Sequence, residues 1–126
     1  MLDWKPWVGL PHVFGEHPKH GRGADCVVMV WAILDSVGVY HPPFDQGWME
    51  LARAGQWEQL QQLWEAGTEP IDGMQEHSVC LFQNGLNGLG VGIVVDKGAL
   101  IVHHKRGVCW LPSKAAKSFQ YRRFVK

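Results

Sequence analysis

Cys26 is the residue in this sequence best placed to do chemistry. It follows a glycine-rich loop and Asp25, and it begins an apolar stretch that we predict to be a fully buried helix over Cys26–Val37. Because the N-terminal end of a helix dipole stabilises negative charge, a thiolate here would be a nucleophile. A free cysteine is also often a small buried apolar residue, so position alone leaves a purely structural role open.

A cysteine nucleophile needs a base, which is usually a histidine from elsewhere in the fold. His103 and His104 end a predicted strand whose sheet must pack against the Cys26 helix. Neighbouring residues of a strand face opposite sides, so only one of the two histidines can point toward Cys26. The sequence does not decide which of them it is.

The elements that must position these residues change in type along the chain. Asp25 can cap the first helix and Gly38 can end it, and two further helical stretches follow before a linker at 67–73. The second half has short β-type runs, a tight-turn signal at Asp96–Gly98 and one helical turn over 112–117. Helices first and a sheet second predict an α+β fold in one domain, 1–126. The predicted strands cover 78–83, 91–96, 99–104, 108–111 and 119–125.

Several segments together resemble NlpC/P60 cysteine peptidases, and most of all the short versions encoded in phage tail modules. The segment 7–12 (WVGLPH) looks like the family's G-x-P motif, and 21–30 (GRGADCVVMV) like its glycine-rich loop and D-C pair. The segments 80–82, 91–95 and 99–108 look like its core strands. The resemblance implies a papain-like fold, with a buried N-terminal helix that bears the cysteine and packs on an antiparallel sheet.

The same resemblance implies roles for individual residues. Cys26 would attack a peptide bond in a peptidoglycan stem peptide, and His103 or His104 would assist it. His12 and Asp25 would lie where the oxyanion or the substrate is bound. The family's base histidine falls on Gly90, which cannot accept a proton, and this loss should cost roughly 10²–10⁴-fold in rate.

Two functions therefore stay open. The chain is either a peptidoglycan endopeptidase of a phage tail hub, baseplate or tail tip, or a catalytically inactive structural subunit of the tail. The partners implied are other tail proteins and, for the enzyme, stem peptides. The expected location is the virion, assembled in the host cytoplasm, because the N-terminus shows no signal-peptide pattern.

Charge is divided unevenly along the chain. The totals of 12 basic and 12 acidic residues cancel, but residues 1–96 hold all the acids and only four bases, which is −8, and residues 97–126 hold the other eight bases. We expect part of this charge to cancel inside the fold and the remaining basic surface to be a protein-docking face. Nucleic-acid binding is not expected, because no stacking aromatics accompany the basic residues.

Composition also argues against metals, cofactors and membranes. Three cysteines without a CxxC pair do not form a disulfide framework or a structural zinc site. Pro18 between His17 and His20 disfavours a helical pair of metal ligands, so neither a metal nor a cofactor is expected. The longest apolar run, 27–34, is far shorter than the ~20 residues of a membrane span.

Overall fold

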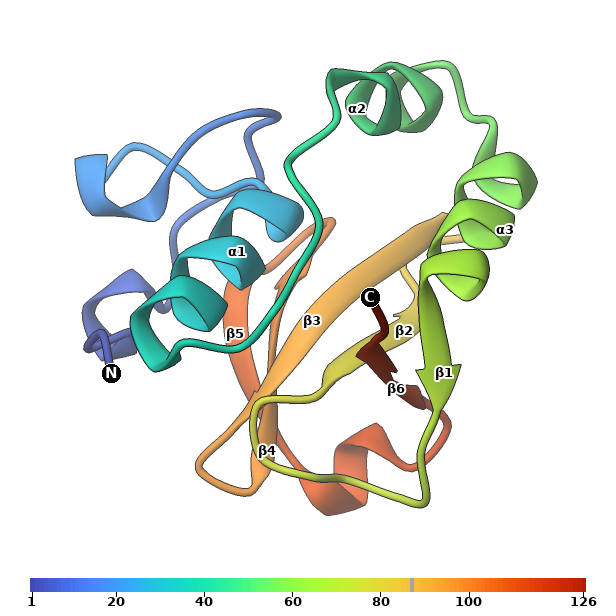
Figure 1. Cartoon of the computed structure of the whole chain (residues 1–126). Coiled ribbons are helices and arrows are strands. Elements are labelled where there is room, and N and C mark those ends of the chain that lie inside the picture. Colours follow the sequence, from blue (N-terminus) through green and yellow to red (C-terminus); the bar gives the residue numbers. More distant parts are fainter. Residues whose placement is uncertain (87) are drawn as a thin grey trace.

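The computed structural model describes residues 1–86 and 88–126, and it has the predicted α+β order. Three helices, α1 (Cys26–Val37), α2 (Gln46–Arg53) and α3 (Trp57–Gly67), precede the strands of the sheet (Figure 1). Short 3-10 turns cover Lys5–Trp7, Pro18–His20 and Ser113–Ala116. The strands within the described residues are β1 (Thr68–Pro70), β2 (Val79–Gln83), β3 (Leu89–Val95), β4 (Gly98–His103), β5 (Gly107–Pro112) and β6 (Gln120–Phe124).

The six strands form one antiparallel sheet in the order β1-β6-β2-β3-β4-β5. The β3–β4 hairpin closes through Asp96 and Lys97, whose φ angles of 52° and 64° fit the two-residue turn predicted from the sequence. β1 was not predicted, because residues 67–73 were interpreted as a linker. It forms only by pairing with β6 from the far end of the chain.

Helix α1 has the bounds that its local signals predict. The Asp25 side chain caps its first turn, and Gly38 ends it with a φ of 71° in the left-handed region. Met29, Ile33 and Leu34 are completely buried, but Asp35 and Ser36 are exposed, so the prediction of a fully buried helix is wrong for its last turn. The helix packs against β3, so the apolar face of the sheet and the start of α1 come together (Figure 1).

Alternation along the strands gives the sheet two different faces. Val91, Ile93 and Val95 of β3 pack in the core that contains α1. The other face is a second apolar cluster around Phe82 and Ile101, covered in part by the Ser113–Ala116 turn and the segment that follows it. β3 is therefore buried on both faces, which explains its almost continuously apolar sequence.

An aromatic cluster joins the helices to the end of the sheet. The indole of Trp31 in α1 meets the rings of Trp48 in α2, Trp64 in α3 and Phe124 in β6, with ring centroids 5.3–5.7 Å apart and edge-on geometry. Such edge-to-face pairs contribute about 0.5–1.5 kcal/mol each beyond the area they bury.

Within the described residues, no helix is long and apolar enough to cross a membrane.

The basic C-terminal strand is partly neutralised within the fold. The Arg122 guanidinium donates to Oγ1 of Thr68 at 2.6 Å and to two backbone carbonyls of the α3–β1 region. Arg123 forms an ion pair with Glu69 of β1. Of these two basic residues, only Arg123 has its charge offset by an acidic side chain, because the acceptors of Arg122 are neutral oxygens.

Candidate functional site

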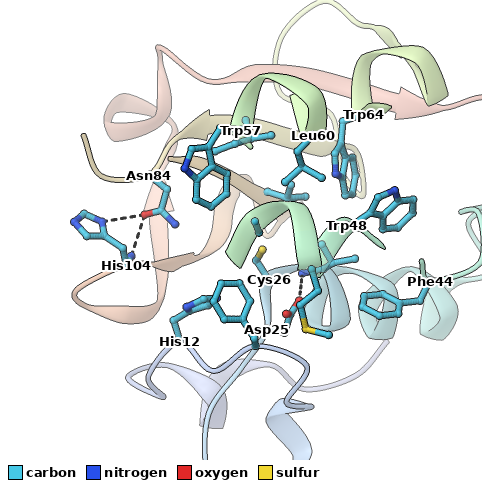
Figure 2. Close-up of a pocket in the computed structure, with 16 residues that line it drawn as sticks. His12, Asp25, Cys26, Phe44, Trp48, Trp57, Leu60, Trp64, Asn84 and His104 are labelled. Atoms are coloured by element: carbon cyan, nitrogen blue, oxygen red, sulfur yellow. Dashed lines mark hydrogen bonds between the residues drawn. The ribbon is translucent and has the colours of Figure 1, made fainter. Parts of the chain in front are cut away.

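Cys26 lies at a cavity of about 240 Å³ between the start of α1, the two following helices and the near end of β3. Of the predicted site residues, His12, Asp25 and His104 line this cavity together with Cys26. Most of the remaining wall is aromatic or aliphatic, as Figure 2 shows. The fold thus brings four of the predicted residues to one place.

Asp25 is occupied by backbone hydrogen bonds. Its Oδ1 accepts from the N–H groups of Val27 at 2.9 Å and Val28 at 3.2 Å, and its Oδ2 accepts from Gly15 at 2.9 Å. The side chain is 4% exposed. A carboxylate would repel an oxyanion, so the geometry fits a residue that fastens the glycine-rich loop to α1 and thereby positions Cys26.

The Cys26 thiol holds its proton tightly. Burial, and next the negative charge of Asp25, raise its pKa to about 12, although the backbone N–H groups of Val91, Val27 and Cys26 act in the opposite direction. The stabilisation expected from the helix start is therefore present but outweighed. The expectation of a stabilised thiolate is corrected: the thiol is protonated at neutral pH.

The rings of the two neighbouring histidines lie side by side, with centroids 4.4 Å apart, because β4 ends at His103 and His104 lies in the turn that follows. Nδ1 of His103 accepts from the N–H groups of Lys105 and Arg106, and this side chain does not line the cavity. His104 does line it, but its ring is directed outward, with Asn84 between it and Cys26 (Figure 2). Among the described residues, no hydrogen bond joins the Cys26 sulfur to a histidine nitrogen.

His12 is the histidine on the inner wall of the cavity. Its ring packs edge-on against Phe14, with centroids 4.6 Å apart, and lies on the Cys26 side of the site (Figure 2). Burial lowers its pKa, and the nearby charge of Asp25 raises it by less. His12 is therefore neutral at pH 7 and could accept a proton if it came within reach of the sulfur.

Gly90 does not face Cys26. A β-carbon at this position would overlap the ring of Phe82, which belongs to the cluster on the opposite face of the sheet. The β3 residues that line the cavity are Leu89 and Val91. The position where a base on β3 could serve Cys26 is thus 89 or 91 and not 90, because alternation turns residue 90 away.

Asn84 is a site residue that sequence reasoning missed. Its Oδ1 accepts from the backbone N–H of His104 at 2.9 Å and lies 3.0 Å from the ring Nδ1, while its Nδ2 donates to the Val102 carbonyl at 3.1 Å. The β3–β4 backbone pairing ends at Gly92–Ile101. Beyond that pair, the Asn84 side chain bonds the backbone carbonyl of Val102 and the backbone N–H of His104. The Asn-Gly pair at 84–85 predicts only a turn, since the role depends on the register of β4.

Comparison with protein-family models, with curated proteins and with solved structures gave no match. The resemblance to NlpC/P60 peptidases therefore stays a prediction from the sequence. In the part of the chain that the structure describes, no three histidine, cysteine or acidic side chains gather in a way that could hold a metal ion.

Proposed function

We propose that this chain is a degenerate NlpC/P60-like domain that serves as a subunit of a phage tail and hydrolyses peptidoglycan poorly or not at all. One observation carries the second part of this proposal. The β3 side chains beside Cys26 are those of Leu89 and Val91, and neither can accept a proton. The tail assignment is supported by the resemblance of the segments around Cys26 to the short phage versions.

The chemistry of the site points the same way. A thiol with a pKa of about 12 is ionised in about one molecule in 10⁵ at pH 7. General-base catalysis that could compensate for this is worth about 10²–10⁴-fold, and it requires an acceptor within hydrogen-bond reach. His104 is held outside by Asn84, so the missing base on β3 is not replaced from β4.

The hydrolysis claim is tested with purified muropeptides. Wild type and Cys26→Ala should give the same chromatogram over hours of incubation. Cys109→Ala is the matched control, because Cys109 is a half-buried free cysteine that does not line the cavity. Cleavage by wild type and Cys109→Ala that disappears in Cys26→Ala would refute the proposal.

The particle claim has its own test. If the chain is a tail subunit, mass spectrometry of purified particles from the organism that encodes it should find the chain at a fixed ratio to the other tail proteins. Particles that form with normal tails in a deletion strain, and that lack the chain in the parent, would rule this role out.

A second candidate, a peptidase that uses His12 as its base, is favoured by one specific observation. His12 lines the same cavity as Cys26 and has a lowered pKa. If wild type cleaves muropeptides, His12→Ala should abolish cleavage while His104→Ala keeps most of it. The opposite order would assign the base to His104 and require the Asn84 contact to open.

A further inference from the structure

The cavity beside Cys26 has an apolar interior that neither proposed role of the thiol uses. Side chains from the N-terminal loop, the second and third helices and β3 line it, among them Phe14, Trp48, Met49, Ala52, Leu60 and Leu89. An engineered apolar cavity of roughly 150 Å³ holds benzene, which has six carbon atoms. In the same proportion, the volume of about 240 Å³ found here accommodates an apolar chain of about nine or ten carbons.

The cavity opens to solvent at His104. This residue is exposed, whereas the other described residues that line the cavity are buried or half-buried. In Figure 2 the His104 ring lies at the edge of the site and is directed outward, with Asn84 between it and Cys26. The outermost part of an occupant therefore lies beside His104 and Asn84.

The turn that carries His104 is positively charged. Lys105 and Arg106 follow it and are exposed, and their backbone N–H groups donate to Nδ1 of His103, so residues 103–106 form one compact turn. Burial, and next the positive charges of the other three residues of this turn, lower the pKa of His103. In the part of the chain that the structure describes, neither Lys105 nor Arg106 pairs with an acidic side chain. The mouth of the cavity therefore offers positive charge to an anion.

Asp25 places the opposite charge on the inner side of the cavity. Its carboxylate belongs to the wall, is 4% exposed and lies on the other side of Cys26 from His104 in Figure 2. An anion brought to that side would be repelled and would lose its hydration among apolar side chains. At the mouth, the same anion keeps its water and meets the charged turn. An occupant with one anionic end is therefore oriented with that end at His104 and its apolar part inside.

We propose that this cavity binds a single-chain amphiphile, an unbranched acyl chain of about ten carbons or fewer that ends in a carboxylate. The chain fills the apolar interior, and the carboxylate stays at the mouth beside the positively charged turn. The inference goes beyond the proposed function and does not depend on it. No bond to Cys26 is formed or broken.

A series of unbranched carboxylates tests the fit of the chain. The dissociation constants of hexanoate, octanoate, decanoate and tetradecanoate are measured by calorimetric titration of the intact protein at low ionic strength, below the concentrations at which they form micelles. Each methylene added up to decanoate should tighten binding about fourfold. Tetradecanoate should gain little over decanoate, because its extra methylenes find no room in the cavity.

Charge variants test the mouth. The double variant Lys105→Gln, Arg106→Gln should weaken octanoate binding about fivefold and leave the binding of uncharged 1-octanol unchanged. The double variant Lys114→Gln, Lys117→Gln is the matched control, because both lysines are exposed and neither lines the cavity. It should bind octanoate as wild type does.

A blocked cavity tests the site itself. Ala52→Phe, which adds a ring to the cavity wall, should abolish binding of decanoate and of 1-octanol, whereas Ala54→Phe at the exposed end of the same helix should not. The chain series and the surface charge variants keep the test decisive if Ala52→Phe does not fold.

Three results would overturn the inference. The first is the absence of saturable decanoate binding, or decanoate binding that persists in folded Ala52→Phe. The second is a gain per methylene that continues undiminished from decanoate to tetradecanoate, which would place the chain outside the cavity. The third is an equal loss of octanoate affinity in the two double variants, which would remove the role of the turn at the mouth.

Discussion

Replacing Asp25 by alanine should destabilise the protein far more than removal of an ordinary helix cap. Loss of an N-cap costs about 1 kcal/mol, and loss of the charged acceptor of the Gly15 N–H costs about 1.5–3 kcal/mol more. The free energy of unfolding should therefore fall by about 3 kcal/mol. With an unfolding entropy of about 2.1 cal/mol/K per residue and 126 residues, Tm should drop by about 11 °C.

Asp45→Ala provides the matched control for this measurement. Asp45 caps α2 through a single bond to the Gly47 N–H at 2.8 Å, and its side chain is exposed. Its loss should cost only about 0.5–1 kcal/mol, or about 2–4 °C in a calorimetric scan. If Asp25→Ala and Asp45→Ala lower Tm equally, Asp25 does not hold the glycine-rich loop and its assignment as the residue that positions Cys26 fails.

Four further predictions concern the thiol and the strands around it. At pH 8, Cys109 should react with iodoacetamide before Cys26. Burial raises the pKa of both thiols, but at Cys26 the negative charge of Asp25 adds to burial and raises the pKa to about 12, whereas Arg106 lowers that of Cys109. Peptide mapping of partly labelled protein checks the order. Because the unfolded Cys26 thiol loses its proton near pH 9 and the folded one near pH 12, the free energy of unfolding should fall as pH rises between these values. Denaturant titrations should show a smaller fall in Cys26→Ala, and an identical fall in both proteins argues against the raised pKa. Leu89→His should speed alkylation of Cys26 at pH 8. Gly90→His should leave the alkylation rate unchanged and lower the free energy of unfolding by about 1–3 kcal/mol, because its side chain would overlap Phe82 on the opposite face of the sheet. Faster alkylation in Gly90→His would contradict the strand register. Asn84→Ala should lower stability by about 1–2 kcal/mol and speed hydrogen exchange at the His104 amide, and unchanged exchange there would exclude the Asn84 bond.

The parts of the fold that depend on local signals could be predicted from the sequence. Helix α1 has both of its ends marked, by the Asp25 cap and by Gly38, and the turn at Asp96–Gly98 carries its own residue signature. β1 has no such signal. Thr68 becomes a strand residue only because Phe124, from the other end of the chain, pairs with it.

The candidate site could be predicted only as a set of residues, because its geometry depends on strand register. The resemblance places the missing base at residue 90, whereas strand alternation makes Leu89 and Val91 the residues that face the cavity. The choice between His103 and His104 likewise required the register of β4. Asn84 could not have been selected, since its partners lie 18 and 20 residues away.

The missing base also helps to explain why the Cys26 thiol keeps its proton. Asp25 builds the start of α1, and its charge is the second cause of the raised pKa of Cys26, after burial. In a working cysteine–histidine pair, the imidazolium next to the sulfur offsets both effects. Here Leu89 and Val91 take the place of such a histidine. The negative charge of Asp25, which caps α1, therefore raises the pKa of Cys26 with no histidine cation from β3 to offset it. Leu89→His should therefore supply a proton acceptor and a stabilising positive charge together. Its effect on thiol reactivity should exceed that of Asp25→Asn, which removes the negative charge but also loses one of the two acceptor oxygens that hold Gly15, Val27 and Val28.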